Sequence, residues 1–227
     1  AFPHSHGAAL RYDPFRDFEP VAHVSHFQLA LLVHGDVPAR TVSEYVAIVK
    51  KDARYGDYAS AAAGSLPHYF GVLFGRAAGI EMVHIPYKGG VPAALAVSQG
   101  ESHLVLTNPS GVQAHIDSGR LRAIAMTGAK RSPAAPELPT VAEAGDLRGY
   151  EASLWYGIMA PAATPPDILQ LLHAETSKAV QARDFRDPLT AFAIDVIGST
   201  PDEFSTHLKN ETAKWTKVIR EANIRAD

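Results

Sequence analysis

The sequence predicts an α/β protein in which helices cover a largely parallel sheet. Short apolar runs of strand length alternate with helical segments. Capping residues or glycines stand at the ends of those segments. The connections are short, and no internal repeat or low-complexity tract interrupts them. The pattern therefore favours compact strand–helix units over modules joined by long linkers.

The expected strands are short and mostly apolar. The most continuous run is 27–33, which reads FQLALLV and is followed by the turn 34–36. Four further candidates are bounded by turn residues and lie at 57–60, 81–85, 103–107 and 121–127. Because each of the four is followed by a helical segment, we expect neighbouring strands to run in the same direction.

The expected helices carry recognisable starts and stops. Capping boxes, in which a Thr caps the helix and a Glu three residues later reaches back, occur at 41–44, 140–143 and 200–203. Other helices are expected at 66–78, 92–98 and 111–118, with stops at Gly79, Gly100 and Gly119. Two prolines at 165–166 open one more helix, and its apolar face carries Ile168, Leu171 and Leu172.

The composition excludes several classes of protein. The chain has 227 residues, a formal charge of -3 and a sequence pI near 6.4, so nucleic acid and anionic lipid are not expected partners. The absence of cysteine excludes disulfides, thiolate metal sites and cysteine nucleophiles. No apolar run reaches the roughly 20 residues that span a bilayer. The chain opens on Ala1 and shows no signal peptide, which suggests that an upstream segment was removed.

The first candidate binding site is the small-residue turn 58–65, at the end of the expected strand 57–60. Ligands of open α/β sheets bind where strands end and helices begin. Small side chains let the backbone approach a ligand closely, and the amides and dipole of the following helix favour an anion. The alternative is a plain tight turn in which Ser65 only caps the helix.

The second candidate site is 84–90, with the sequence HIPYKGG, at the end of the expected strand 81–85. Tyr87 offers a hydroxyl, Lys88 offers an ammonium group, and the glycines expose backbone, a combination suited to a carboxylate. The alternative is that Tyr87 packs, Lys88 is solvated and the glycines only form the turn. A phosphate-binding loop is excluded, because the glycine spacing before Lys88 and the hydroxyl after it are missing.

Metal and catalytic sites find little support in the sequence. His4 and His6 lie near the start of the chain without a carboxylate at ligand spacing, and the other histidines are isolated. A G-x-S-x-G elbow is absent, so a hydrolase that uses Ser65 with His68 is a poor match. We therefore expect no enzyme activity, no metal and no other cofactor.

Seven motifs, in order along the chain, resemble those of the Bug-type receptors. These receptors are the extracytoplasmic substrate-binding proteins of tripartite tricarboxylate transporters. The motifs are YDPFRDFEPV at 12–21, SAAAGSLPH at 60–68, HIPYKG at 84–89, GRLRAIA at 119–125, RSPAAPELPTVAEAG at 131–145, WYGIMAPAATP at 155–165 and STPDEF at 199–204. Each motif is short, but their order over nearly the whole chain is specific.

The resemblance implies a periplasmic-binding-protein-like (type II) α/β fold, with two lobes that close over a ligand. Lobe one would comprise 1–34 and 150–227, lobe two would comprise 35–149, and crossing strands would lie at 27–33 and 154–159. Lobe two of such receptors holds a carboxylate through amides at its helix starts. The implied ligand-binding residues are Ser60, Ala61, Gly64, Ser65, His68, Tyr87, Lys88, Gly89 and Thr107.

The chain departs from the family pattern in and near its binding loops. Ala62 stands where the family has Gly, which should narrow the loop or remove a positive-φ conformation. Thr107, followed by Asn108, occupies the place of an acidic residue that usually faces the ligand. A neutral wall suits a ligand without an ammonium group, because a buried cation would lack its partner. His103 replaces a family Asp, which is expected to be a surface change.

A further departure concerns lobe one. The family has a βαβ unit with an anion-binding loop before the first motif, whereas this chain starts almost at that motif. We therefore expect an incomplete first lobe with open sheet edges and exposed apolar helix faces. Such a lobe should either be reorganised or be covered in an oligomer.

The resemblance also implies a function and a location. The protein would be a periplasmic receptor that captures a dicarboxylate, a tricarboxylate or an aromatic carboxylate. It would deliver this ligand to the membrane permease subunits of a tripartite tricarboxylate transporter. Two alternatives remain: a periplasmic sensor that feeds a signalling system, and a truncated form without a physiological ligand.

Overall fold

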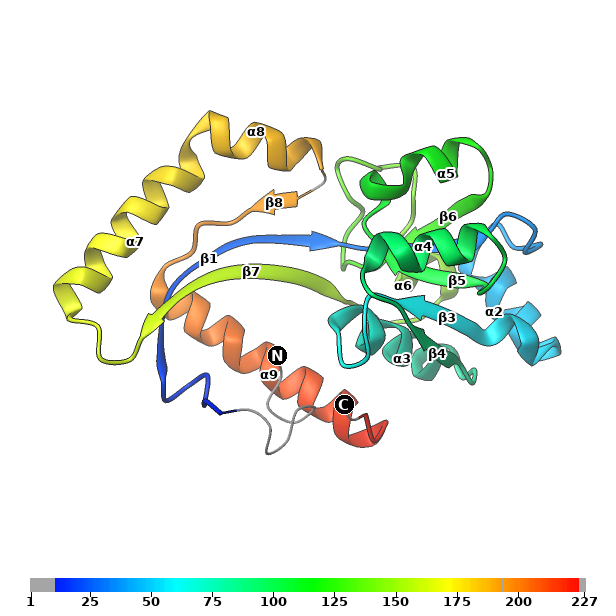
Figure 1. Ribbon diagram of the computed structural model, residues 1–227, viewed down its shortest axis with the longest axis horizontal. Coiled ribbons are helices and arrows are strands. Elements are labelled where there is room, and N and C mark those ends of the chain that lie inside the picture. Colours follow the sequence, from blue (N-terminus) through cyan, green and yellow to red (C-terminus); the bar gives the residue numbers. More distant parts are fainter. Residues whose placement is uncertain (1–10, 193, 225–227) are drawn as a thin grey trace. The chain divides into compact units, whose positions relative to one another are not determined.

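The computed structural model describes residues 11–192 and 194–224, and the chain divides into two compact units (Figure 1). Among the described residues, unit 1 contains 11–27 and 154–224, and unit 2 contains 28–153. The chain passes from one unit to the other at Phe27–Gln28 and again at Ser153–Leu154. His4 and His6, considered above as metal ligands, lie outside the described residues.

The unit boundaries differ from the lobe boundaries expected at residues 34–35 and 149–150. Strand β2 (Ala30–His34) belongs to unit 2, because it pairs with two strands of that unit's sheet. Residues 150–153 also belong to unit 2. The Tyr150 hydroxyl donates to the Phe70 carbonyl over 3.3 Å, and the Ala152 amide donates to the Thr127 carbonyl over 2.8 Å.

Unit 2 is built on a five-stranded sheet with the order β4-β3-β5-β2-β6. Its other strands are β3 (Asp57–Ser60), β4 (Val83–Pro86), β5 (Leu104–Thr107) and β6 (Leu121–Met126). Strand β3 pairs in parallel with β4 and β5, while β2 runs antiparallel to β5 and β6. The strands β3 to β6 therefore point the same way, and their carboxyl ends meet at one edge.

Helices alternate with these strands, as the sequence pattern predicted. They are α2 (Val42–Lys51), α3 (Leu66–Ala78), α4 (Gly90–Ser98), α5 (Gln113–Asp117) and α6 (Val141–Gly145), with short 3-10 turns η2 (Ala53–Gly56) and η3 (Pro109–Val112). The bounds of α3 match the expected 66–78, and the capping boxes at Thr41 and Thr140 are both formed. Gly79, Gly100 and Gly119 adopt the positive φ angles expected of helix stops.

One face of this sheet packs on α4 through small and branched side chains. Ala30, Leu32, Ala59 and Val105 from the strands form a buried cluster with Ala93, Ala94 and Val97 of α4. Neighbouring residues of a strand point to opposite faces, so Tyr58 faces α3. A Cβ at Gly71 of α3 would lie only 2.1 Å from the Tyr58 ring, so the helix can approach this closely only with glycine there. Both faces of the sheet are thus covered.

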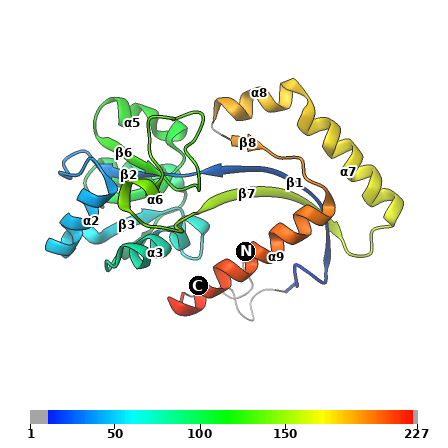
Figure 2. The same ribbon diagram turned by 180° about the vertical axis from the view of Figure 1, so that it is seen from behind.

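Unit 1 is built on a three-stranded sheet with the order β7-β1-β8. Its strands are β1 (Phe18–Gln28), β7 (Ser153–Pro161) and β8 (Ile194–Val196), and its helices are α7 (Pro166–Gln181), α8 (Arg183–Ala191) and α9 (Pro201–Glu221). Strand β8 pairs antiparallel with the end of β1. In both views, α9 lies along β1 and β7, and α7 and α8 border the β8 side (Figures 1 and 2).

The core of unit 1 is an aromatic cluster between this sheet and α9. The His23 ring stacks on the His207 ring at a centroid distance of 4.4 Å and packs against Phe204 and Trp155. Phe204 is fully buried, and a Cβ at Gly157 would lie 2.1 Å from its ring. The expected capping box at Thr200 is formed and starts this helix. One face of the small sheet is therefore tightly packed.

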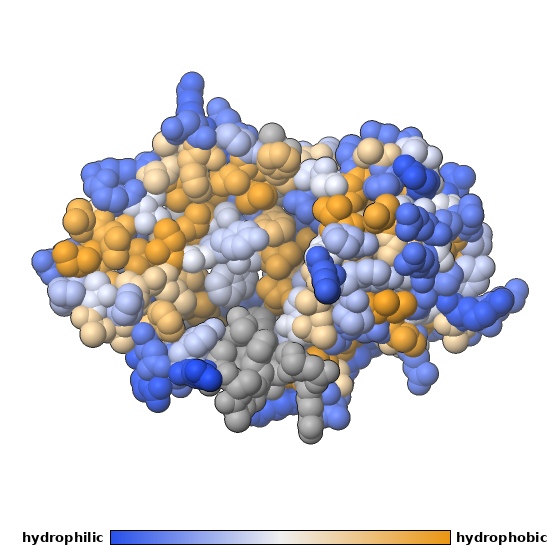
Figure 3. Space-filling model, viewed as in Figure 1, coloured by the Kyte–Doolittle hydropathy of each residue, from blue (hydrophilic) through white to orange (hydrophobic). Residues whose placement is uncertain are grey.

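The rest of unit 1 exposes large apolar side chains. Tyr156 is 61% exposed, Leu171 is 57% exposed and Phe192 is 53% exposed. Figure 3 shows apolar residues gathered over α7, α8 and the three strands on the face in view. The apolar face predicted for the helix at 165–166 thus exists, but among the described residues it is not buried.

The expected strand 27–33 was wrong in its continuity. The structure has two strands, β1 and β2, which end and begin on either side of Leu29. Leu29 leaves the ladder because its amide binds the Thr127 hydroxyl over 3.0 Å and its carbonyl accepts from the Thr127 amide. The uninterrupted apolar run hides this change, since both strands are buried and carry the same residue types.

Candidate functional site

The two predicted binding loops meet at the carboxyl edge of the unit 2 sheet. Loop 60–65 follows β3, and loop 87–89 follows β4, its neighbour in the sheet. The Tyr87 amide donates to the Ser60 carbonyl and the Gly89 amide donates to the Ala61 carbonyl, each over 2.9 Å. The structure thus joins the two candidate binding segments into one site.

Loop 60–65 is held by its own hydroxyl groups. The Ser60 side chain is fully buried, and its hydroxyl lies 3.1 Å from the Ala62 carbonyl. The Ser65 hydroxyl donates to the same carbonyl over 2.7 Å and accepts from the His68 amide at the start of α3. Ser65 therefore caps the helix, as one of the two readings of this loop required.

The alanine at position 62 is accommodated without strain. Ala62 is exposed and has a negative φ, and the positive φ of this loop is at Gly64, at 70°. A methyl group at 62 therefore needs no left-handed backbone, and the turn is made two residues later. The loop therefore does not use the positive-φ conformation that alanine was expected to remove at residue 62.

Some backbone amides of loop 60–65 are already hydrogen-bonded to neighbouring residues, so they are not available to a ligand. The Gly64 amide donates to His68 Nδ1 over 3.1 Å, and the Ser65 amide donates to the Ala62 carbonyl over 3.3 Å, so neither is free. Within the described chain, the amides of Ala62 and Ala63 make no hydrogen bond. They are the donors that this loop can offer to a ligand.

The second loop offers an open helix start and an unpaired cation. Gly89 has a φ of 124°, and it precedes α4 without any side-chain cap. The first amides of α4 are therefore left without a helical partner. The Lys88 side chain is exposed and makes no ion pair or hydrogen bond with any described residue. Together these groups favour a negatively charged ligand.

The Tyr87 ring packs as the alternative interpretation of this loop expected, and its role in ligand binding stays a prediction. Its ring is half-buried and packs against the apolar cluster under α4. Its hydroxyl lies 3.5 Å from the Glu101 carboxylate, at the limit of hydrogen bonding. The backbone of Tyr87, rather than its phenol, joins the two binding loops.

Thr107 ends β5 at the same edge. Its side chain is nearly buried, and a Cβ at Gly90 would lie 2.8 Å from Thr107 Oγ1, so the start of α4 packs directly on this hydroxyl. The next residue, Asn108, accepts from the amide and hydroxyl of Ser110 and caps η3. His103 lies at the opposite end of β5, where its ring and amide both bind Asp57.

His84 is a residue of this site that the predicted set missed. It lies on β4, and its Nε2 is 2.7 Å from Ser60 Oγ. Its ring stacks on the His68 ring, with centroids 3.7 Å apart and planes within 7°. The HIPYKG motif contained this histidine, but only the parallel register of β3 and β4 places it beside Ser60.

Both stacked histidines are held in the neutral form at neutral pH. Burial lowers the pKa of His68 to about 4. Burial, and after it the proximity of His68, lowers the pKa of His84 to about 4. The permanent positive charge of the described loops is therefore that of Lys88, while the histidines contribute hydrogen bonds.

The geometry does not assemble the hydrolase considered above. Ser65 Oγ binds the Ala62 carbonyl, and His68 Nδ1 binds the Gly64 amide, so this serine is not bonded to the imidazole. Ser60 does contact His84, but Ser60 is fully buried. Among residues 11–192 and 194–224, no group of three or more His, Asp or Glu side chains could hold a metal ion.

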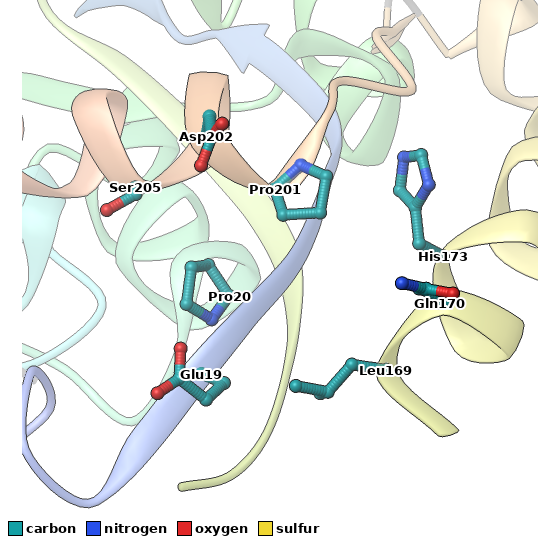
Figure 4. A pocket seen from close by; sticks show the side chains of 8 residues that line it. All are labelled: Glu19, Pro20, Leu169, Gln170, His173, Pro201, Asp202 and Ser205. Carbon is teal, nitrogen blue, oxygen red and sulfur yellow. The ribbon is translucent and has the colours of Figure 1, made fainter. Parts of the chain in front are cut away.

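A separate hollow of about 430 Å³ lies in unit 1, between β1 and the starts of α7 and α9 (Figure 4). It is lined by Glu19, Pro20, Leu169, Gln170, His173, Pro201, Asp202 and Ser205. The carboxylates of Glu19 and Asp202 oppose the binding of another carboxylate. This hollow is therefore not a second candidate for the anion predicted from the sequence.

The two α/β units define the class of protein. The fold is that of the two-lobed periplasmic binding proteins: the solved periplasmic binding protein BugD aligns over 98% of this chain and 75% of its own, with a TM-score of 0.84 and 27% identity. The family model described as "Tripartite tricarboxylate transporter family receptor" matches residues 1–224. The chain belongs to this receptor family, as the seven motifs predicted.

Individual relatives support the assignment. The protein BugT of Bordetella pertussis is 32% identical over 96% of this chain and 66% of its own length. An R. palustris protein solved with adipate aligns over 100% of this chain and 76% of its own, with 30% identity and a TM-score of 0.88. MatC from Rhodopseudomonas palustris, solved with bound malate, aligns over 96% of this chain and 74% of its own, with 26% identity and a TM-score of 0.82.

The chain is shorter than these relatives. It spans 64% and 66% of the length of two curated proteins that it matches. None of the helices in the described part of the chain is both long and apolar enough to cross a membrane.

Proposed function

We propose that this chain is the carboxylate-capturing part of a solute receptor, and that the ligand anion binds at the carboxyl edge of the unit 2 sheet. One observation carries the proposal: two neighbouring loops, tied to each other by backbone hydrogen bonds, leave their remaining amides unpaired. The donors are those of Ala62 and Ala63 and of the uncapped start of α4, with the Lys88 ammonium beside them. Such a set stabilises a carboxylate.

The neutral side chains at the end of β5, which we call the neutral wall, restrict the class of ligand. Thr107 and Asn108, both neutral, stand at the end of β5, and the carboxylates that act on the Tyr87 side chain are those of Glu101, 3.5 Å from its hydroxyl, and Asp57. A ligand with a buried ammonium group would find no counter-ion here. We therefore propose a dicarboxylate, a tricarboxylate or an aromatic carboxylate. The adipate and malate bound to two relatives are dicarboxylates, which supports this class.

Titration calorimetry with adipate, malate, citrate and benzoate tests the proposal. We expect saturable binding of at least one of them. Lys88→Met should weaken it roughly three- to tenfold, because it removes one charge-assisted contact. Lys50→Met, which removes an exposed charge at the far end of α2, is the matched control and should not change the affinity. No heat with any carboxylate would contradict the proposal.

The ligand class can be tested separately at the end of β5. Thr107→Asp places a carboxylate beside the start of α4, and we expect it to abolish binding of dicarboxylates by charge repulsion. Thr107→Ser keeps the hydroxyl and should bind within about twofold of the wild type, which is less than 1 kcal/mol. Unchanged affinity in Thr107→Asp would place the ligand away from this wall.

We also propose that the protein acts in the periplasm and hands its ligand to the permease subunits of a tripartite tricarboxylate transporter. The family assignment supports this partnership. Deletion of the gene should abolish uptake of the radiolabelled carboxylate that binds in calorimetry. Normal uptake with loss of carboxylate-induced gene expression would instead favour a sensory role. The hydrolase reading has no support in the geometry of Ser65 and His68.

A further inference from the structure

The contact between His84, Ser60 and His68 is not explained by ligand binding alone. His84 lies on β4, the strand at one end of the sheet order, and its side chain is only partly buried. A partly exposed histidine on an edge strand adds little to a core. Yet this ring makes a 2.7 Å hydrogen bond to Ser60 and a close parallel stack with His68. Both partners belong to the candidate anion-binding edge.

The hydrogen bonds determine which ring nitrogens carry protons. His68 Nδ1 accepts from the Gly64 amide, so the proton of neutral His68 is on Nε2. Ser60 has one hydroxyl proton, and the Ala62 carbonyl, 3.1 Å away, is an acceptor that cannot supply one. A third and longer contact joins Ser60 Oγ to Ser65 Oγ over 3.5 Å, but the Ser65 proton goes to the Ala62 carbonyl. The two shorter contacts of Ser60 are satisfied together when His84 Nε2–H donates to Ser60 Oγ and Ser60 donates to Ala62.

We propose that His84 is a positioning residue for the anion-binding edge: it orients the Ser60 hydroxyl and the His68 ring, and through them the backbone of loop 60–65. The inference rests on the proposed function of that loop. Ser60 orients the Ala62 peptide, whose neighbouring amides are free, and His68 holds Gly64 in its turn. The carbonyls of Ser60 and Ala61 in turn hold loop 87–89.

The role of His84 follows from the order of these contacts. The ring itself binds no free amide, so it acts on a ligand only through Ser60 and His68. Without it, the Ser60 hydroxyl can rotate between acceptors, and the His68 ring loses the surface that keeps it parallel. The loop amides then sample several directions, and part of the binding free energy is spent on ordering them.

Two substitutions separate the hydrogen bond from the ring. His84→Gln keeps an amide donor near the position of Nε2, and His84→Phe keeps the stack but loses the donor. The affinity is measured for the carboxylate that binds best in calorimetry. We expect His84→Phe and Ser60→Ala each to lower this affinity about tenfold, and His84→Gln to lower it about threefold or less. The double variant Ser60→Ala/His84→Phe should bind as weakly as either single variant, because both remove the same bond.

The matched control is His34→Gln, at the C-terminal end of the antiparallel strand β2 and thus at the opposite edge of the sheet. It should not alter the affinity. Equal affinities of wild type and His84→Phe, or losses that add in the double variant, would overturn the proposal. So would an equal loss in His84→Gln and His84→Phe, since it would mean that the hydrogen bond is irrelevant.

A second readout needs no ligand and therefore separates this inference from the proposed function. Imidazole ¹⁵N spectra should show His68 and His84 both protonated at Nε2, and Ser60→Ala should give a mixture of tautomers at His84 only. Hydrogen exchange of the Tyr87 and Gly89 amides should accelerate about tenfold in His84→Phe and less in His84→Gln. If no carboxylate binds, the proposed function fails and these spectra still decide on His84. A single Nε2–H tautomer of His84 in Ser60→Ala would overturn the positioning role, even if His84→Phe does not fold.

Discussion

The two units differ in how completely their sheets are covered. In unit 2, α4 packs on one face and α3 on the other, and all four residues of β5 are buried. In the described part of unit 1, the face toward α9 is tightly packed, but large apolar side chains elsewhere are exposed, among them Tyr156 and Leu171. The difference shows that similar patterns of strands and amphipathic helices bury both faces of the sheet in unit 2 but leave a large apolar surface exposed in unit 1.

The difference between the two units also bears on ligand binding. The candidate anion-binding loops belong to the unit with the two-sided core, where neighbouring parallel strands hold them in register. A rigid sheet edge presents backbone amides in fixed directions, which reduces the entropy lost on binding. The exposed apolar face of unit 1, in contrast, offers area for association.

The largest effect is expected from truncating a core residue of unit 2. Phe74→Ala should lower the free energy of unfolding by about 3–5 kcal/mol, because Phe74 is fully buried between Tyr45 and Tyr150. Urea unfolding followed by circular dichroism measures this. Phe192→Ala, at an exposed position of unit 1, is the control and should cost less than about 1 kcal/mol. Similar losses for both would break the contrast between the units.

Acid should destabilise both units through histidines whose pKa is lowered in the folded chain. Burial lowers the pKa of His23 in unit 1, and of His68 and His84 in unit 2, to about 4, below the unfolded value near 6.5. The unfolded chain then binds more protons than the folded chain between these pH values. The stability present above pH 6.5 is therefore lost as the pH falls toward 4, by roughly 1–3 kcal/mol for each histidine.

Urea midpoints at pH 7 and pH 4.5 measure this effect. His23→Gln should reduce the pH dependence of unit 1, which the fluorescence of Trp155 and Trp215 reports, since both tryptophans lie in that unit. The dependence of unit 2 should persist in this variant and be reduced in His68→Gln/His84→Gln. A pH-independent midpoint in the wild type would show that these histidines titrate alike in the folded and unfolded chain.

A smaller effect is expected where unit 1 is tightly packed. Gly157→Ala drives a methyl group into the Phe204 ring and should cost about 1–3 kcal/mol. Gly111→Ala in unit 2 meets only Val91 Cγ2 at 3.8 Å, an ordinary contact, and is the control. Thermal unfolding of the two variants measures the difference. An unchanged melting temperature for Gly157→Ala would mean that the α9 face of unit 1 is looser than its geometry indicates.

The smallest effect on stability is expected on the exposed face of unit 1. Leu171→Ser should change the free energy of unfolding by less than about 0.5 kcal/mol, because Leu171 is 57% exposed.

We also expect the wild-type chain to self-associate through the exposed face of unit 1 that contains Leu171, since exposed apolar patches favour association. Sedimentation velocity over a range of concentrations should show an oligomer that Leu171→Ser weakens and Lys50→Met does not. A monomer at all concentrations would contradict this expectation.

Much of the local structure could be predicted from residues alone. The capping boxes at Thr41, Thr140 and Thr200 mark three helix starts correctly, and α3 has the expected bounds. These signals are readable because a cap depends on residues within one turn. The short helix α8 and strand β8 carry no such signals and were not anticipated. The break at Leu29 depends on Thr127, about a hundred residues away, and no local pattern reports it.

The sequence by itself determined the family, the α/β class and the two segments that carry the candidate site. Ordered motifs and the residue types of the loops 60–65 and 87–89 are enough for that, because helix starts and glycine turns are local properties. Only the tertiary structure decided which amides are free, that the Tyr87 ring packs on the cluster under α4, and that His84 stands against Ser60 and His68. The reason is physical: hydrogen-bond partners across β3 and β4 are set by strand register, which no single segment contains.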